Sequence, residues 1–183
     1  MKLTLVRHGQ TTENLQRIVQ GQMPGHLSQQ GIQQAEAAAQ QLYNEKFDVI
    51  YCSDLQRCLD TLEPITKGHA STPVVITEEL RERFAGSYQG KVVDLPYWNS
   101  LPGTETTRKY PGGESWQDVK DRIRPFLNQL YQEHPEYSVL IVSHAGVVRA
   151  IRSYLENRSL EDVFREPVPN GGVWVEQMVS LLV

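Results

Sequence analysis

The chain has 183 residues, of which 39% are hydrophobic, and its 18 Lys and Arg against 22 Asp and Glu give a formal net charge of -4. This length can bury one sizeable core, so we expect a single domain over residues 1–183. A mildly acidic protein is not attracted to nucleic acid or to an anionic membrane, and no apolar stretch approaches the roughly 20 residues of a membrane span. We therefore expect a soluble, cytoplasmic protein that binds neither nucleic acid nor membrane, and the sequence leaves monomer and homodimer both open.

An apolar run at residues 3–6 leads into Arg7, His8 and Gly9. A short apolar run closed by a glycine-bearing turn predicts a buried strand, with His8 at the carboxyl end of that strand. Ligands of open α/β sheets bind at these ends. The polar loop that follows reaches about Gly25 and is longer than the usual connection of about 4 to 6 residues, which favours a functional role for it.

The sequence then predicts a helix, a strand, a second helix and a second strand. Ser28 is a plausible N-cap of the first helix, and apolar residues recur along it at helical spacing, namely Ile32, Ala35, Ala39 and Leu42. Ser53 and Gln56 form a capping box for the second helix, which should end near Pro64. The two strands cover residues 48–52 and 73–77.

Residues 84–113 mix Pro, Gly, Thr and aromatic residues without a period, and we expect them to form a lid-like segment. A helix follows, in which Ser115 and Asp118 form a capping box. The run at residues 139–142 is apolar on both faces, as is typical of a central parallel strand covered by two helix layers. The last predicted elements are helices at about 147–155 and 160–164 and a strand at 172–175. Strands alternating with helices indicate an α/β sandwich.

Two further predictions concern the cysteines and the last residues of the sequence. Cys52 and Cys58 lack zinc-ligand spacing and no other Cys or His cluster accompanies them, so we expect buried thiols and no metal site. The apolar tail at residues 178–183 predicts either a docked last strand or an interface.

Arg7 and His8 together point to phosphate chemistry. The arginine fork of donors matches a phosphate group, and an unprotonated histidine can attack phosphorus to form a covalent phosphoryl intermediate. Taken alone, so short a motif is better explained by a surface Arg-His pair at a turn. A second histidine, His144, follows the apolar run at 139–142 in the same way, with a buried structural histidine as the alternative.

Arg57 and Glu82 extend this hypothesis. Arg57 falls in the first turn of a predicted helix, where the macrodipole disfavours a cation unless an anion is shared there; a solvated arginine is the alternative. Glu82 is a candidate general acid that would protonate a leaving alkoxide and later accept a proton from water. Because Arg81 and Arg83 flank it, a surface salt bridge is the alternative.

Several blocks of the sequence, in order along nearly the whole chain, resemble the histidine phosphatase superfamily, also called phosphoglycerate mutase-like. They are Leu5-Val6-Arg7-His8-Gly9-Gln10-Thr11, Asn14, Leu27-Ser28 with Gly31 and Gln34-Ala35, Ser53-Asp54-Leu55-Gln56-Arg57-Cys58, Leu80-Arg81-Glu82 and Val142-Ser143-His144. The resemblance implies a three-layer α/β/α sandwich with a mostly parallel central sheet.

The resemblance also implies roles for individual residues. His8 would be the phosphorylated nucleophile, Glu82 the proton donor, and Arg7, Arg57 and His144 the phosphate pocket, with no metal and no cofactor. Asn14 matches a position that contacts phosphate. We further expect substrate contacts from Gly9, Thr11, Gln20, Gly21, Arg83 and Ala145.

The match favours the small-molecule phosphatases of the superfamily. Residues 110–115 are similar to that branch, whereas the insertion with an arginine pair that marks cofactor-dependent mutases is missing. We therefore expect a metal-independent phosphomonoesterase acting on a small phosphorylated metabolite. A phosphoglycerate mutase and a catalytically silent phosphate-binding module remain the alternatives. A second anionic group could be bound by any of four cations, Arg83, Lys91, Arg108 and Lys109, with solvated surface cations as the competing and favoured explanation.

Overall fold

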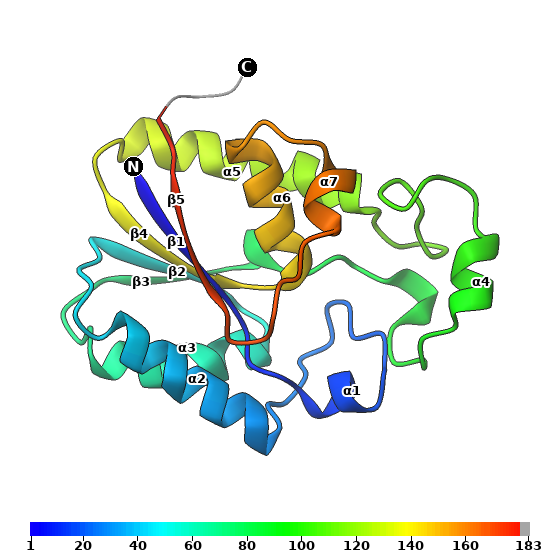
Figure 1. Ribbon diagram of the computed structural model, residues 1–183, viewed down its shortest axis with the longest axis horizontal. Helices are drawn as coiled ribbons and strands as arrows, with labels where there is room; N and C mark the ends of the chain where they lie inside the picture. The colour runs from blue at the N-terminus through cyan, green and yellow to red at the C-terminus, as the bar shows by residue number, and fades with distance from the viewer. Residues whose placement is uncertain (180–183) are drawn as a thin grey trace.

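A five-stranded sheet forms the centre of the computed structural model, which describes residues 1–179 (Figure 1). The strands stand in the order β3-β2-β4-β1-β5. Four of them are parallel, and β5 runs antiparallel to β1 at one edge. The predicted mostly parallel sheet is therefore confirmed. The strands are β1 (Lys2–Arg7), β2 (Val49–Ser53), β3 (Val74–Thr77), β4 (Ser138–Ser143) and β5 (Val173–Gln177).

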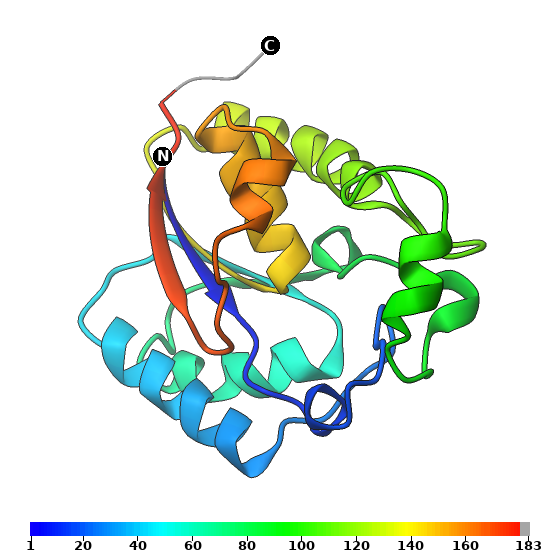
Figure 2. The ribbon, with the colours of Figure 1, turned by 45° about the vertical axis from the view of Figure 1, so that its right-hand side comes forward.

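Helices cover both faces of this sheet (Figures 1 and 2). Successive residues of β4 divide between two cores, because side chains of a strand alternate between its faces. Val139 and Ile141 pack in one core with α5 and α6, whereas Leu140 and Val142 pack in the other with α2 and α3. The three-layer α/β/α fold is confirmed. The helices are α1 (Thr12–Leu15), α2 (Gln29–Leu42), α3 (Gln56–Lys67), α4 (Leu95–Ser100), α5 (Trp116–Glu133), α6 (Ala145–Leu155) and α7 (Leu160–Phe164), with 3-10 turns η1 (Glu78–Leu80) and η2 (Gly86–Tyr88).

The register of the two central strands determines where the histidines lie. Arg7 of β1 pairs with Ser143 of β4 in a parallel arrangement, so His8 and His144 are the next residues on neighbouring strands. The backbone N–H of His8 donates to the carbonyl of Ser143 at 2.9 Å. Both imidazoles therefore start from the same sheet edge, as the apolar runs before them predict.

Two local predictions about α3 were wrong. Leu55, not Ser53, is its N-cap, and no side chain caps it. The hydroxyl of Ser53 instead lies 2.9 Å from Nε2 of His144, the residue that follows β4. Pro64 lies inside α3, which continues to Lys67 because Ile65 is buried in the core and this packing outweighs the poor helix propensity of proline.

The predicted apolar stripe of α2 is also corrected. Ile32 is 43% exposed, and the buried residues are Gly31, Ala35, Ala38 and Leu42. Gly31 packs directly on the loop after β1, where an added Cβ would lie 2.0 Å from the carbonyl oxygen of Gln10. This close approach turns the next residue of the helix, Ile32, toward solvent. The capping box of Ser115 and Asp118 in α5 is confirmed.

Residues 84–113 extend away from the sheet and carry α4 (Figure 1). They bury a small cluster of their own, formed by Ala85, Trp98 and Tyr110. At the other end of the chain, Met178 is buried and its backbone N–H donates to the carbonyl of Met1. Val179 is 83% exposed, and residues 180–183 of the predicted apolar tail lie outside the described residues.

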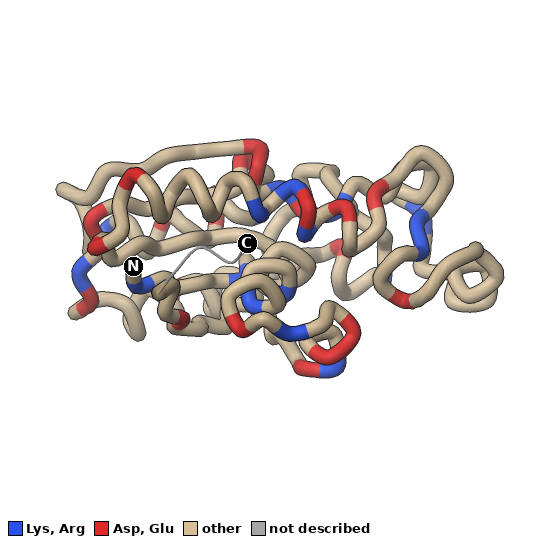
Figure 3. The backbone as a smooth tube through the Cα atoms, turned by 90° about the horizontal axis from the view of Figure 1, so that it is seen from above, with Lys and Arg blue, Asp and Glu red and all other residues tan. Residues whose placement is uncertain are grey.

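Charged residues of both signs are interspersed over the helices and loops (Figure 3). Cys52 and Cys58 are free, buried thiols, as expected. Among residues 1–179, no helix combines the length and the apolar character needed to cross a membrane.

Candidate active site

His8 and His144 lie in contact at the carboxyl edge of the sheet. Their ring centroids are 5.2 Å apart and their planes make an angle of 61°. His144 is completely buried, whereas His8 is 4% exposed and lines a cavity of about 310 Å³. His8 therefore separates His144 from the cavity.

The contacts of His8 leave one ring nitrogen available. Its Nδ1 lies 2.7 Å from the carbonyl oxygen of Gly9. A carbonyl only accepts hydrogen bonds, so this contact assigns the proton to Nδ1 and leaves a lone pair on Nε2. Burial first, and then the charges of Arg57 and Arg7, hold the pKa of His8 well below 6.5. The ring is neutral, which is the form that a nucleophile requires.

Arg57 reaches the same place from the first turn of α3, and it is only 1% exposed. Its Nη2 donates to the carbonyl of Gly21 at 2.8 Å, and Nη1 donates to the carbonyls of Met23 and Pro24. None of the ion pairs found within residues 1–179 includes Arg57, so all these partners are neutral. The solvated arginine considered from the sequence is wrong. A buried cation without a counter-ion favours binding of an anion.

His144 holds the side chain of Arg57 through a hydrogen bond. Its Nδ1 accepts a hydrogen bond from Nε of Arg57 at 3.2 Å, so its proton lies on Nε2 and points to the hydroxyl of Ser53. Burial and the neighbouring Arg57 and His8 hold the pKa of His144 well below 6.5. Both ring nitrogens of His144 therefore contact protein groups. His144 acts on the cavity only through its contacts with His8 and Arg57.

Arg7 adds a second cation. Its Nη1 donates to the carbonyl of Val168, while its Nε is buried with no partner in the described structure. Burial lowers the pKa of Arg7 to about 10, with Arg149 and Arg57 adding to the fall and Glu82 opposing it. The guanidinium stays charged near neutral pH, and the Arg7 side chain lines the cavity.

Glu82 is held by backbone groups and not by a salt bridge. Its Oε1 accepts from the N–H of Arg83 at 3.0 Å, and its Oε2 accepts from the N–H of Gly146 at 3.1 Å. Of its sequence neighbours, Arg81 pairs with Asp54 instead, as part of a separate surface contact. The carboxylate therefore lies at the N-terminus of α6, where it also lines the cavity.

Gly146 is a residue that the sequence reasoning missed. A Cβ on it would lie 2.1 Å from Cζ3 of Trp116 and 2.4 Å from Oε1 of Glu82. Only glycine allows the carboxylate and the indole to approach this backbone. The signal in the sequence is a glycine two residues after His144, at the start of a helix.

Arg83 also lines the cavity, with its guanidinium between aromatic rings. Its guanidinium carbon is 4.2 Å from the ring centroid of Trp116 and 4.8 Å from that of Trp98. Its Nη1 is buried without a partner in the described structure, as is Oε1 of Gln20. Both side chains contribute to the cavity wall, and Oε1 of Gln20 packs against Gly25 in the loop that also contacts Arg57.

The predicted site residues divide into two groups. The cavity wall includes eight of them: Arg7, His8, Asn14, Gln20, Gly21, Arg57, Glu82 and Arg83. The other four, Gly9, Thr11, His144 and Ala145, are not part of the wall. The N–H of Gly9 donates to Oγ1 of Thr61, Thr11 is the N-cap of α1, and Ala145 is the first residue of α6.

The sequence reasoning did not identify the apolar part of the wall. Trp116 belongs to the apolar face of α5, and the others fall in segments without periodicity, so no pattern marked them. They are Ile18, Val19, Ala85, Val93, Leu95, Trp98, Tyr110 and Trp116, with Glu105 at the rim. Within residues 1–179 no group of three or more His, Cys, Asp or Glu side chains could hold a metal ion.

Comparison with known proteins adds to this geometry. A family model described as the histidine phosphatase superfamily (branch 1) matches residues 3–178. A metal-independent phosphoserine phosphatase of Arabidopsis thaliana is 35% identical over 163 residues, which cover 82% of this chain and 66% of that protein. A glucosyl-3-phosphoglycerate phosphatase of Mycolicibacterium vanbaalenii is 34% identical over 84% of this chain and 73% of that protein.

Solved structures of phosphatases are also similar to this chain. A mycobacterial glucosyl-3-phosphoglycerate phosphatase in complex with VO3 superposes with a TM-score of 0.84 at 29% identity, covering 95% of this chain and 90% of that one. An alpha-ribazole phosphatase from Shigella flexneri also has a TM-score of 0.84, at 28% identity, covering 96% and 89% of the two chains.

Proposed function

The chain belongs to the histidine phosphatase superfamily, and from this premise we propose that it hydrolyses a small phosphate monoester through a phosphohistidine formed on Nε2 of His8. The observation that carries the proposal is the neutral imidazole of His8, with a free Nε2, beside a buried Arg57 that has only neutral partners. Relatives named as phosphatases support hydrolysis as the reaction.

In the first step, the lone pair of Nε2 attacks phosphorus and the bond from phosphorus to the ester oxygen breaks. Glu82, protonated for this step, gives its proton to the departing alkoxide. Arg7 and Arg57 stabilise the negative charge on the phosphoryl oxygens, a role for which preorganised donors in a buried site are well suited. His144 positions Arg57 through the hydrogen bond to Nε.

In the second step, the Glu82 carboxylate takes a proton from water, and the water oxygen attacks the phosphohistidine. The phosphorus–nitrogen bond breaks, its electron pair returns to Nε2, and inorganic phosphate leaves. Each group ends in the protonation state in which it began. Two guanidinium groups supply the charge stabilisation that a metal ion would otherwise provide.

Arg83 supports a substrate with a second anionic group. Its side chain lines the cavity, Nη1 has no hydrogen-bond partner, and none of the ion pairs within residues 1–179 includes it. A carboxylate or second phosphate of the substrate would supply the missing counter-charge. The other three candidate cations have partners elsewhere. Lys109 pairs with Asp118, Lys91 lies over the ring of Tyr88, and Arg108 donates to the carbonyls of Leu101 and Gly103.

A volume of about 310 Å³ limits the substrate to a small metabolite. Asn14 lines the same wall and is proposed as a further phosphate contact. The cytoplasmic location and the choice between monomer and homodimer stay predictions, as does the division of the chain into one domain with a lid over residues 84–113.

Replacing His8 tests the proposal. The His8→Asn variant is expected to lose at least about 10³-fold of its turnover of an aryl phosphate and to form no acid-labile phosphoenzyme in a rapid quench. His69→Asn is the matched control, because His69 is also buried but contacts the carbonyl of Leu42 far from the site. Turnover retained by His8→Asn would contradict the proposal.

Assays of phosphate release, phosphoenzyme formation and phosphoglycerate interconversion separate the two alternative functions from the proposed one. A phosphoglycerate mutase would interconvert phosphoglycerates in a coupled assay faster than it releases phosphate. A silent binding module would bind phosphate esters, and the wild-type protein would neither release phosphate nor form a phosphoenzyme.

A further inference from the structure

Two side chains that do not reach the cavity hold the segment that carries Glu82. Arg122, on α5, donates from Nη1 to the carbonyl of Glu79 at 2.6 Å and from Nη2 to the carbonyl of Arg81 at 3.0 Å. These two carbonyls lie just before Glu82 in the chain. Arg122 therefore fixes the backbone on the N-terminal side of the carboxylate.

Glu114, two residues before α5, fixes the other side. Its Oε2 accepts from the N–H of Phe84 at 2.8 Å, and its own N–H donates to the carbonyl of Phe84 at 2.8 Å. Its Oε1 accepts from Nε of Arg122 at 3.0 Å, and Oε2 also accepts from Nη2 of Arg122 at 3.3 Å. The two side chains are thus joined to each other as well as to the segment.

Residues 81–85 have no helical or strand structure of their own. Such a segment depends on outside contacts for its position. Both members of the pair are only 24% exposed, and their hydrogen bonds are charge-assisted, so they hold more firmly than a surface pair. The planar fork of arginine presents five donors in a fixed geometry, which suits simultaneous hydrogen bonds to two carbonyls and a carboxylate.

We propose that Arg122 and Glu114 are positioning residues that hold Glu82 in place for proton transfer to the leaving group. The proposal rests on the proposed function, because it takes Glu82 as the general acid. A general acid must lie within about 2.6 to 3.2 Å of the oxygen that it protonates. A displacement of about 1 Å can cost about 10²-fold in rate, so a clamp on both sides of Glu82 has a direct effect on chemistry.

The leaving group provides the test. An alkyl phosphate releases a strongly basic alkoxide that needs the proton, whereas 2,4-dinitrophenyl phosphate releases a stable phenolate that does not. We use kcat/KM because it reports on steps up to cleavage of the ester bond. Arg122→Met is expected to lower kcat/KM for glycerol 3-phosphate by about 10²-fold and for the dinitrophenyl ester by less than about threefold.

Three further variants complete the experiment. Glu82→Gln should show the same selectivity, and so should Glu114→Gln, which keeps the shape of the side chain and carries the test if Arg122→Met fails to fold. Arg124→Met is the matched control, because Arg124 is an exposed arginine on the same helix, and both substrates should react as in the wild type.

Equal losses for both substrates in Arg122→Met and Glu114→Gln would overturn the clamp while leaving hydrolysis through His8 intact. Equal losses in Glu82→Gln would remove Glu82 as the acid, and the clamp with it. Failure of the proposed function would show itself in a different experiment, as retained turnover in His8→Asn or as the absence of a phosphoenzyme in the wild type.

Discussion

The carboxylate of Glu82 and the backbone N–H of Gly146 are joined by a hydrogen bond of 3.1 Å. This bond links the loop after β3 to the first turn of α6, two segments that are more than 60 residues apart in the chain. The link requires glycine, because a Cβ at residue 146 would collide with both Glu82 and Trp116.

Gly146→Ala is therefore expected to displace Glu82. We expect a loss of about 1 to 3 kcal/mol in the free energy of unfolding from overpacking, and a larger loss of kcat/KM for an alkyl phosphate than for an activated aryl phosphate. Urea unfolding and the two-substrate assay measure these effects. Gly68→Ala, at the C-terminus of α3 and remote from the site, should leave both values of kcat/KM unchanged. A fully active Gly146→Ala variant would show that the carboxylate does not need this position.

Anion binding should stabilise the protein, because Arg57 is a buried cation with neutral partners only. Inorganic phosphate at about 100 times its Kd should add about 2.7 kcal/mol to the free energy of unfolding, or roughly 5 to 10 °C in Tm for a domain of this size. Thermal unfolding in phosphate and in chloride of equal ionic strength provides the comparison. The shift should fall by half or more in Arg57→Met, and an undiminished shift there would place the anion elsewhere.

Stability should decline as the pH falls below 6.5. His8 and His144 are neutral in the folded protein and their pKa values lie well below 6.5, so the unfolded chain binds more protons in that range. Each histidine then contributes up to about 1.4 kcal/mol per pH unit, or about 2.7 kcal/mol for the pair. Urea unfolding at pH 7.5, 6.5 and 5.5 gives the slope. His8→Asn should reduce the slope between pH 6.5 and 5.5 by about half, and an unchanged slope would contradict the assignment.

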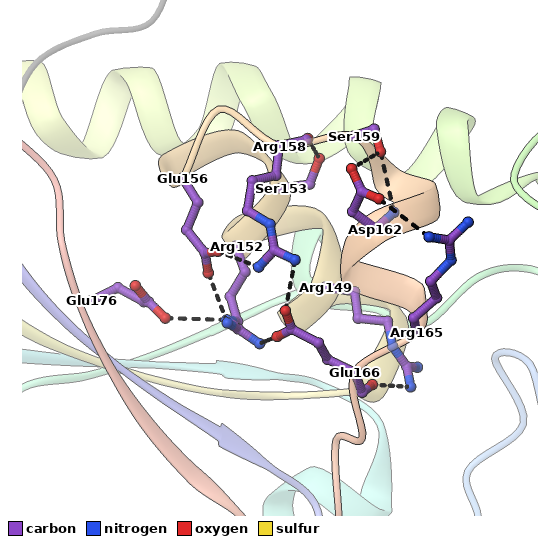
Figure 4. Close-up of polar contacts among 10 residues, drawn as sticks. All are labelled: Arg149, Arg152, Ser153, Glu156, Arg158, Ser159, Asp162, Arg165, Glu166 and Glu176. Atoms are coloured by element: carbon purple, nitrogen blue, oxygen red, sulfur yellow. Dashed lines mark hydrogen bonds and ion pairs between the residues drawn. The ribbon is translucent and has the colours of Figure 1, made fainter.

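Arg152 holds the end of α6 against later parts of the chain (Figure 4). It is 13% exposed and pairs with Glu156 at 2.8 Å, Glu166 at 2.7 Å and Glu176 at 3.2 Å. Arg152→Met leaves the partly buried carboxylate of Glu176 without its cation, and we expect a loss of about 1 to 3 kcal/mol in urea unfolding. Arg165→Met is the matched control.

In that control variant, an arginine that is 80% exposed loses a 3.7 Å ion pair with Asp162. The free energy of unfolding should change by no more than about 0.5 kcal/mol. Similar losses in the two variants would indicate that the network around Arg152 has no special role.

The anion contact proposed for Arg83 predicts a preference between two substrates that differ in one group. Glycerol 3-phosphate and 3-phosphoglycerate differ by a carboxylate, so Arg83→Met should lower kcat/KM for 3-phosphoglycerate by about 10- to 100-fold and change that for glycerol 3-phosphate little. The backbone N–H of Arg83, which binds Glu82, is retained in this variant. Equal losses for both substrates would argue against recognition of the carboxylate by Arg83.

The sequence predicted the layered fold well because its strands and helices carry strong periodicity. The apolar run at residues 139–142 and the capping box at Ser115 are both present in the structure. Phosphate chemistry was foreseeable from the resemblance of the ordered sequence blocks to the histidine phosphatase superfamily, because the short motifs around Arg7, His8 and Arg57 were each ambiguous alone; the structure gathers these three residues around one cavity.

What could not be predicted depends on contacts between distant segments. The neutral partners of Arg57 are carbonyls of a loop about 35 residues away, and the exposure of Ile32 follows from the packing of Gly31 on another loop. Ser53 looked like a helix cap, yet its hydroxyl contacts a histidine more than 90 residues further along the chain. Local patterns contain no information about such partners.

The position of β1 in the sheet has a consequence for synthesis of the protein. Its two neighbours, β4 and β5, come from residues 138–143 and 173–177. A growing chain therefore carries an apolar strand with both hydrogen-bonding edges bare until residues 138–177 have been synthesised. Until then the edge of the sheet that holds His8 and His144 is incomplete, and β1 is open to pairing with other chains.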